Sequence, residues 1–270
     1  MSSLQAGPEA RGMIPCVGII GVGHLAGYLV EGLHRASQVT EIVLSPRNAE
    51  RAARLADRFG CTVAKSNQAV ADAADLILVT TRPDDIESVC QELFYQAEQT
   101  VVSVAVGLPL SEFQPAVAPA AAVRALPISC AAINGSPTLL YPAHPQVEAL
   151  FGLLGQVHIL ADESQFTAAS VLSAFYGWVY ALLDEVDRWT ASAGVEPQMA
   201  RTLVLETVRG AAEMALAHPE QDLDSMLRAL ATPGGITEQG LNVLGQGQGL
   251  AVWVEALESV FRRLDRGNQE

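Results

Sequence analysis

The stretch that decides the fold of this chain is Val17-Gly18-Ile19-Ile20-Gly21-Val22-Gly23-His24-Leu25-Ala26. It reads as a short apolar strand followed by a Gly-x-Gly-x-x-Ala turn that opens a helix. Gly21 permits the tight turn, Gly23 lets the backbone approach a pyrophosphate, and Ala26 allows close packing of the helix on the strand. Free N–H groups and the dipole at the helix start favour phosphate charge. The stretch therefore predicts a dinucleotide site; the alternative is a purely structural strand–helix turn.

The end of the next strand indicates which dinucleotide is bound. Residues 41–44 read as the next strand, which ends in Ser45-Pro46-Arg47-Asn48. An NAD-preferring site places Asp or Glu here to accept hydrogen bonds from the ribose 2′-hydroxyl. A hydroxyl at Ser45 and a guanidinium at Arg47 instead suit a 2′-phosphate, so the sequence favours NADP(H). The alternative is that Arg47 only solvates a helix start.

Composition narrows the class of protein. The chain has 270 residues, of which 50% are hydrophobic and 17% charged, which is enough for one or two domains with a sizeable core. A net charge of −14 argues against nucleic-acid binding. The four cysteines have no Cys-x-x-Cys spacing, so we expect free thiols and no metal site. No signal peptide and no uninterrupted transmembrane stretch are apparent, so the sequence predicts a cytoplasmic protein that binds no membrane.

The order of predicted elements divides the chain. Up to about Leu160, short apolar strands alternate with helices, which is typical of a doubly wound parallel sheet buried on both faces. After Asp162 only helices are expected, over residues 164–193, 198–218, 222–231 and 251–265. The predicted organisation is a disordered tail (1–13), a Rossmann-type nucleotide domain (14–161) and a helical dimerisation and substrate domain (162–270).

The helical part carries Ala, Leu and Val on all sides of its helices. A helix that is apolar all round must be buried all round, and about a hundred residues can hardly cover themselves. The sequence therefore predicts that this domain forms a homodimer; whether dimers assemble further is left open.

Several motifs resemble those of pyrroline-5-carboxylate reductases, in register from about Val17 to Arg266. The first turn is similar to that family's Gly-x-Gly-x-Met-Ala, with His24 in place of Asn. The most specific match resembles Ser-Pro-Gly-Gly-Thr-Thr and lies in the helical part. The matching segments are Ser45-Pro46-Arg47, Val79-Thr80-Thr81-Arg82-Pro83, Ser103-Val104-Ala105-Val106-Gly107, Val123-Arg124-Ala125-Leu126-Pro127 and Thr232-Pro233-Gly234-Gly235-Ile236-Thr237.

The resemblance implies a nucleotide domain, a helical domain that interlocks between two subunits, and hydride transfer from NADPH to the carbon of a cyclic imine. Positioning that carbon against the nicotinamide supplies much of the rate, and a weak proton donor near the nitrogen completes the site. The expected cofactor-binding residues are Gly21, Gly23, His24, Leu25, Ala26, Ser45, Arg47, Thr80, Thr81, Arg82, Pro83, Ala105, Val106 and Gly107. The expected catalytic residues are Thr237 and Tyr176, and the expected substrate contacts are Ser129, Ser173, Tyr176, Gly234, Gly235 and Thr237.

Three departures from the family pattern concern the substrate. The family's Ser-Gly-Ser-Gly-Pro turn, a cradle for the substrate carboxylate, corresponds here to Ser173-Ala174-Phe175-Tyr176-Gly177. Ile128 replaces an Asn, and Ile236 replaces the first Thr after the glycine pair. One interpretation is neutral drift in packing; the other is an apolar pocket that no longer prefers pyrroline-5-carboxylate. Which imine is reduced, and which group donates the proton, are left open.

Two other classes of NAD(P)-dependent enzyme share parts of this pattern, and each lacks or needs one feature that distinguishes it from this chain. A β-hydroxyacid dehydrogenase would need a lysine in its helical domain, whereas the one lysine of the chain is Lys65. A deazaflavin-dependent NADP reductase shares the first half but lacks the Pro-Gly-Gly-x-Thr element. The remaining alternative to an enzyme is a catalytically diverged NADP(H)-binding dimer with a regulatory or scaffolding role.

Overall fold

The computed structural model describes residues 14–266, so the predicted tail (1–13) lies outside the described residues. The chain divides into two compact units. Of the described residues, those up to Ser170 and those from Arg263 form a sheet unit, and Val171–Arg262 form a helical unit. The predicted boundary was 161/162, nine residues earlier than the observed division after Ser170.

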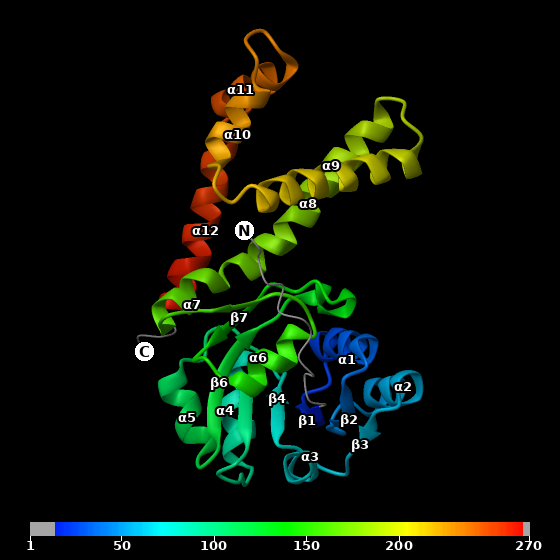
Figure 1. Ribbon diagram of the computed structural model, residues 1–270, viewed down its shortest axis with the longest axis vertical. Helices are drawn as coiled ribbons and strands as arrows, with labels where there is room; N and C mark the ends of the chain where they lie inside the picture. Colours follow the sequence, from blue (N-terminus) through cyan, green and yellow to red (C-terminus); the bar gives the residue numbers. More distant parts are fainter. Residues whose placement is uncertain (1–13, 267–270) are drawn as a thin grey trace, which may run out of the picture. The chain divides into compact units, whose positions relative to one another are not determined.

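The sheet unit is built on one eight-stranded sheet of order β3-β2-β1-β4-β5-β6-β7-β8 (Figure 1). All neighbouring strands pair in parallel except β6 and β7, which are antiparallel. The predicted doubly wound sheet is confirmed, with an antiparallel pair and a final strand β8 that the sequence did not indicate. The strands are β1 (Ile14–Ile20), β2 (Val39–Leu44), β3 (Thr62–Val63), β4 (Leu76–Val79), β5 (Thr100–Ser103), β6 (Ala121–Leu126), β7 (Thr138–Tyr141) and β8 (Val157–Ile159).

Helices cover both faces of this sheet, as the nearly continuous apolar strands require. One buried cluster joins a sheet face to α1, α2 and α6, and a second joins the other face to α3, α4 and α5. The helices of this unit are α1 (His24–Ala36), α2 (Ala49–Phe59), α3 (Asn67–Ala73), α4 (Pro83–Gln91), α5 (Leu110–Val117), the short 3-10 helix η1 (Ser129–Ile133), α6 (Pro145–Gly152) and α7 (Glu163–Ser170).

Helix α7 belongs to the sheet unit because its contacts are there. Phe166 is fully buried, and its ring lies under the guanidinium of Arg124 at 4.4 Å. The carboxylate of Glu163 accepts hydrogen bonds from the same guanidinium at 2.5 Å and from the backbone N–H of Leu110 at 2.7 Å. These contacts explain why the division of the chain falls after α7 and not before it.

The helical unit contains α8 (Leu172–Ser192), α9 (Pro197–Ala217), α10 (Leu223–Leu230), α11 (Ile236–Gln246) and most of α12 (Gly249–Arg266). Gly194 lies between α8 and α9 with a φ of +103°, and Pro197 is the first residue of α9, which agrees with the predicted break between the helices at 164–193 and 198–218. Helix α11 was not predicted, because Gly240 and Gly245 weaken the helical pattern there.

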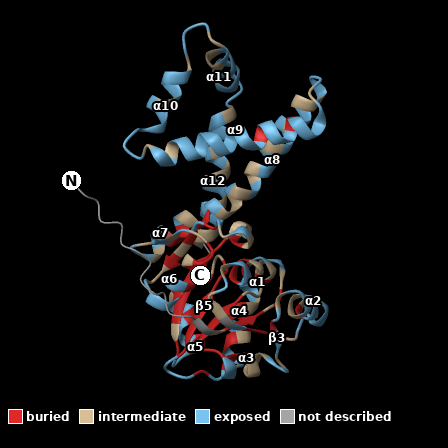
Figure 2. Cartoon of the chain, turned by 45° about the vertical axis from the view of Figure 1, so that its right-hand side comes forward, coloured by how far each residue is buried: buried red, intermediate tan, exposed pale blue. Residues whose placement is uncertain are grey.

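The helical unit has almost no core of its own (Figure 2). Within residues 171–262, all of which are described, only Val171, Ala200 and Val204 are buried. Many large apolar side chains are exposed, among them Trp189 at 70% and Leu216 at 80%. Contrary to the sequence expectation, the segment Glu163–Ser192 is long and apolar enough to cross a membrane by length and composition alone. An apolar helical unit of this kind requires a covering surface.

Candidate functional site

The turn after β1 is shaped by Gly21, whose φ is +97°. A Cβ at this position would lie 2.8 Å from the backbone nitrogen of Thr81, so only glycine fits. The backbone N–H of Gly21 donates to the Oγ of Ser45 at 2.9 Å, and the hydroxyl of Thr80 donates to the carbonyl of Gly21. The turn is therefore fixed to the ends of the two strands that flank β1.

The start of α1 is open to a ligand. Gly23 is its N-cap, no side chain caps the helix, and no acidic residue lies in its first turn. A Cβ at Gly23 would meet no protein atom within 4 Å, so the space in front of the helix start is free. Uncapped N–H groups and the helix dipole favour an anion at this point.

A groove of about 1020 Å³ runs past this helix start. It brings together seven of the predicted cofactor-binding residues from three loops: Gly21, Gly23, His24, Arg47, Thr80, Thr81 and Arg82. The Oγ1 of Thr81 is buried without a hydrogen-bond partner among the described residues, and Arg47 is exposed. An anion-binding helix start, a hydroxyl that lacks a partner and two exposed guanidiniums fit a phosphate-rich dinucleotide.

Ser45 does not face this groove. Its side chain is fully buried and its oxygen accepts the N–H of Gly21, so the structure gives it the task of holding the turn. The predicted contact of Ser45 with a 2′-phosphate has no exposed surface to support it. The sequence could not distinguish the two roles, because holding the turn and binding a 2′-phosphate both need a small hydroxyl residue at the end of β2.

The other predicted cofactor residues lie outside the lining of the groove. Ala26 is fully buried and packs in the core, which agrees with its predicted part in helix–strand packing, and Leu25 is half-buried against the same core. Pro83 is the first residue of α4. The segment Ala105, Val106 and Gly107 follows the carboxyl end of β5, and Gly107 has a φ of +94°.

Two residues of the site were missed. The side chain of Asn48 donates to the carbonyl of Val22 at 3.2 Å and caps α2 by accepting the N–H of Arg51. Arg51 lines the groove, and the sequence did not single it out, because the arginines at 51, 54 and 58 follow the pattern of a solvated helix face. The available signal was that a second arginine follows Arg47 closely, within the first turn of the expected helix.

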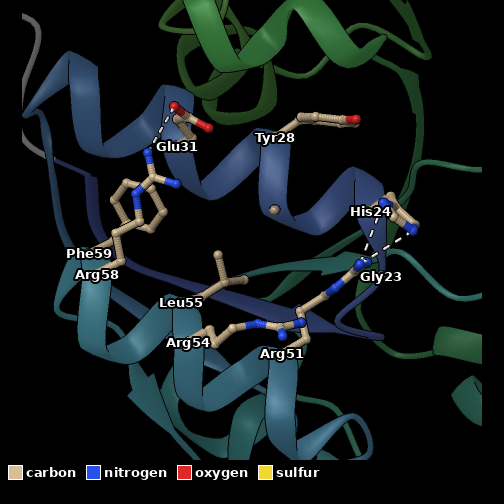
Figure 3. A pocket seen from close by; sticks show the side chains of 10 residues that line it. Gly23, His24, Tyr28, Glu31, Arg51, Arg54, Leu55, Arg58 and Phe59 are labelled. Carbon is tan, nitrogen blue, oxygen red and sulfur yellow. Dashed lines mark hydrogen bonds and ion pairs between the residues drawn. The ribbon is translucent and has the colours of Figure 1, made fainter.

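Figure 3 shows a second, smaller pocket of about 330 Å³ between α1 and α2, next to the groove. Leu55 and Phe59 form its apolar part, and the side chains of Arg51, Arg54 and Arg58 reach into it from α2. Arg54 pairs with Glu50 at 2.7 Å and Arg58 with Glu31 at 3.6 Å. Arg51 instead reaches the ring nitrogens of His24 at 3.3 and 3.5 Å.

The residues predicted to contact substrate are divided between the two units. Ser129 opens η1 in the sheet unit, directly after Ile128. Ser173 and Tyr176 lie in the first turns of α8, while Gly234, Gly235 and Thr237 lie at the start of α11. Within the helical unit, both views draw the hairpin of α10 and α11 away from the first turns of α8 (Figures 1 and 2). One copy of the helical unit therefore does not join Tyr176 to Thr237.

The segment Ser173–Gly177 is helical, whereas the sequence comparison treated it as the counterpart of a turn. The N–H groups of Ala174 and Phe175 both donate to the carbonyl of Val171, at 3.0 and 3.2 Å. They are therefore not available to a carboxylate. The ring of Phe175 packs edge-on against Trp253 at 5.8 Å, and the hydroxyls of Tyr176 and Tyr180 lie 2.9 Å apart.

The segment before α11 forms a tight turn. The N–H of Gly235 donates to the carbonyl of Thr232 at 2.9 Å, and Gly234 has a φ of +71°. Proline followed by a glycine with positive φ is the pattern of a type II turn. The turn presents Ile236 at 89% exposure and leads directly into Thr237.

Comparison with known proteins identifies both halves of the chain. Residues 16–107 match the family model described as NADP oxidoreductase, coenzyme F420-dependent, and residues 163–266 match pyrroline-5-carboxylate reductase dimerisation. A pyrroline-5-carboxylate reductase of Pseudomonas aeruginosa is 32% identical over 269 residues, covering 92% of this chain and 95% of the relative. The chain belongs to the pyrroline-5-carboxylate reductase family. This confirms the resemblance drawn from the motifs.

Further members of the family are similar to this chain over most of its length, in sequence or in structure. A pyrroline-5-carboxylate reductase of Mycobacterium tuberculosis is 32% identical, covering 86% of this chain and 89% of the relative. Among solved structures, the reductase of Streptococcus pyogenes aligns with a TM-score of 0.81 at 23% identity, over 92% of this chain and 97% of that one. That of Plasmodium falciparum, solved with NADP bound, aligns with a TM-score of 0.85 at 20% identity, over 95% and 99%. These structures confirm the fold of this family member.

Proposed function

We propose that this protein is an NADPH-dependent reductase of a cyclic imine, either pyrroline-5-carboxylate, which would give L-proline, or a related imine. The observation that carries the proposal is the likeness to named pyrroline-5-carboxylate reductases over 92% of the chain. The groove at the start of α1 supports the cofactor half of the proposal, because an open helix start and exposed arginines line it together.

In this proposal the chain binds and orients the reactants. When bound, NADPH supplies the hydride that adds to the imine carbon, while a proton adds to the nitrogen and the C=N bond becomes CH–NH. Gly21 and Gly23 hold the pyrophosphate, and Arg47 holds the 2′-phosphate. Residues 105–107 and Pro83 flank the nicotinamide. The hydroxyls of Tyr176 and Thr237 are the proposed proton donors or substrate contacts, beside Ser129, Ser173, Gly234 and Gly235.

We further propose that the functional site needs two copies of the chain. The helical unit lies in the match to the dimerisation family, and its apolar side chains lack a core. A second copy, and not lipid, would cover the exposed apolar side chains of α8. Because Tyr176 and Thr237 lie apart within one helical unit, the partner's copy of one of them would complete the site. A cytoplasmic location and the absence of nucleic-acid partners belong to the same proposal.

The substrate is the open part of the proposal. The N–H groups of Ala174 and Phe175 are used within α8, and aromatic rings fill the position of the family's glycine turn. This supports an imine pocket that is more apolar than one built around a carboxylate.

The test is NADPH oxidation followed optically, with pyrroline-5-carboxylate and with cyclic imines that lack the carboxylate. Turnover of pyrroline-5-carboxylate supports the family reaction, and turnover of the other imines alone supports a reshaped pocket. Thr237→Val should lower kcat/KM about 100-fold if its hydroxyl serves the proton transfer. The matched control is Thr207→Val, since the hydroxyl of Thr207 is bonded to the Leu203 carbonyl of its own helix. Tight NADPH binding without turnover of any imine would contradict the enzyme and support a regulatory dimer.

A further inference from the structure

We infer that Arg51 is a specificity-determining residue for NADP(H), a second guanidinium that binds the 2′-phosphate together with Arg47 and is positioned by His24. This inference rests on the cofactor half of the proposed function and is independent of the imine. Arg51 is half-buried and lines the groove that also contains Gly23, Arg47 and Thr81. It lies in the first turn of α2, whereas Arg47 lies in the loop just before the N-cap Asn48.

The charges along α2 single out Arg51. Three arginines face α1, and two of them have a carboxylate partner: Arg54 pairs with Glu50 at 2.7 Å, and Arg58 with Glu31 at 3.6 Å. No carboxylate among residues 14–266 lies within ion-pair distance of Arg51. In a chain with a net charge of −14, a half-buried guanidinium without a carboxylate partner calls for an anion from outside the chain.

The local framework holds this guanidinium at the groove. Asn48 links the two loops, because its side chain donates to the carbonyl of Val22 and accepts the N–H of Arg51. The Nη2 of Arg51 lies 3.3 Å from the Nε2 of His24, at the first residue of α1 (Figure 3). A neutral imidazole can accept a hydrogen bond from the guanidinium without cancelling its charge, so the positive charge remains available to a phosphate.

The experiment measures dissociation constants by ligand fluorescence or calorimetry, without any imine. We expect Arg51→Ala to weaken NADPH about 10- to 100-fold and to change NADH less than about twofold, since only NADPH carries the 2′-phosphate. The same contrast should hold between 2′,5′-ADP and 5′-AMP. The control is Arg54→Ala, because its guanidinium is already paired with Glu50. It should leave both cofactors within about twofold of the unchanged protein.

Other results would overturn the inference. Equal losses for NADPH and NADH would place Arg51 at the shared pyrophosphate, and unchanged binding of both would make it a surface charge. His24→Ala tests the positioning role: it should weaken NADPH alone, and it should have no further effect when Arg51 is already Ala. A protein that turns over no imine but still discriminates NADPH through Arg51 would sink the proposed reaction and keep this inference.

Discussion

The backbone N–H of Gly21 is bonded to the side-chain oxygen of Ser45 at 2.9 Å, across 24 residues of sequence. The bond joins the glycine-rich turn after β1 to the end of β2, and Ser45 is fully buried around it. Since the turn lines one side of the groove and the end of β2 leads to Arg47 on the other, this one contact sets the spacing between the two sides of the groove.

Ser45→Ala should therefore weaken NADPH and NADH to the same extent. The substitution leaves the partly buried N–H of Gly21 without its partner, which costs about 1 kcal/mol in the free energy of unfolding. Denaturant unfolding measures that cost, and fluorescence titration measures the two dissociation constants. Selective loss of NADPH would instead mean that Ser45 contacts the 2′-phosphate after all.

Arg47→Ala should give the opposite pattern. Arg47 is exposed, has no ion-pair partner within the described chain, and lines the groove, so its removal should not change the unfolding free energy by more than about 0.5 kcal/mol. It should weaken NADPH about tenfold or more and leave NADH nearly unchanged. The same titrations check this, and equal losses for both cofactors would remove Arg47 from the 2′-phosphate.

Ser45 and Arg47 show which features of the site could be predicted from the sequence and which could not. The motif Gly-x-Gly-x-x-Ala predicted the strand, the turn and the helix correctly, because each of its small residues answers a local steric demand. It could not tell that Ser45 faces inward, since that depends on which hydrogen bonds the folded turn leaves open. Arg51 was missed for the same reason: its pattern is that of a solvated helix face, and only the packing of α2 beside α1 brings it to His24.

For whole elements, too, the sequence predicted some features of the structure and missed others. All-round apolar helices predicted a dimer, and the chain indeed matches a dimerisation family there. Helix α11 escaped prediction because its glycines mask the pattern, and β8 escaped because three residues carry too little periodicity. The helical course of Ser173–Gly177 could not be transferred from the family pattern Ser-Gly-Ser-Gly-Pro, whose glycines and proline are unfavourable inside a helix.

Glu163→Ala should destabilise the sheet unit. Arg124 is 1% exposed, and burial lowers the pKa of its guanidinium while the carboxylate of Glu163 opposes that shift. Removing the carboxylate leaves a buried cation unpaired, at a cost of about 3 kcal/mol in the free energy of unfolding, at the low end because Glu163 is 30% exposed. Denaturant unfolding measures the loss, and Glu98→Ala, in an exposed loop, is the control.

A double variant tests whether the loss of stability comes from the unpaired charge of Arg124. Replacing the pair by apolar residues, Arg124→Met with Glu163→Met, should recover most of the lost stability, since no unpaired charge then remains. A double variant as unstable as Glu163→Ala would mean that the carboxylate acts through the N–H of Leu110 instead of through Arg124.

Acid should weaken the start of α9. The N–H groups of Gln198 and Met199 donate to the carboxylate of Glu196 and hold its pKa below the ordinary 4.5. A lowered pKa in the folded state means that this stabilisation is complete above about pH 4.5 and is lost as the pH falls through the folded value. The melting temperatures of the unchanged protein and Glu196→Gln should differ at pH 7, and the difference should shrink as the pH falls below 4.5. A constant difference would exclude the capping role.

The stability of the helical unit should depend on protein concentration. With Val171, Ala200 and Val204 as its only buried residues, this unit has too little core to fold alone, so a second copy must supply the missing apolar contacts. Light scattering should give at least twice the chain mass of 28.6 kDa. The melting temperature followed by circular dichroism should rise with concentration. A monomer that melts cooperatively at a concentration-independent temperature would contradict both the dimer and the completion of the site by a partner, because then nothing would bring Thr237 of one copy to Tyr176 of another.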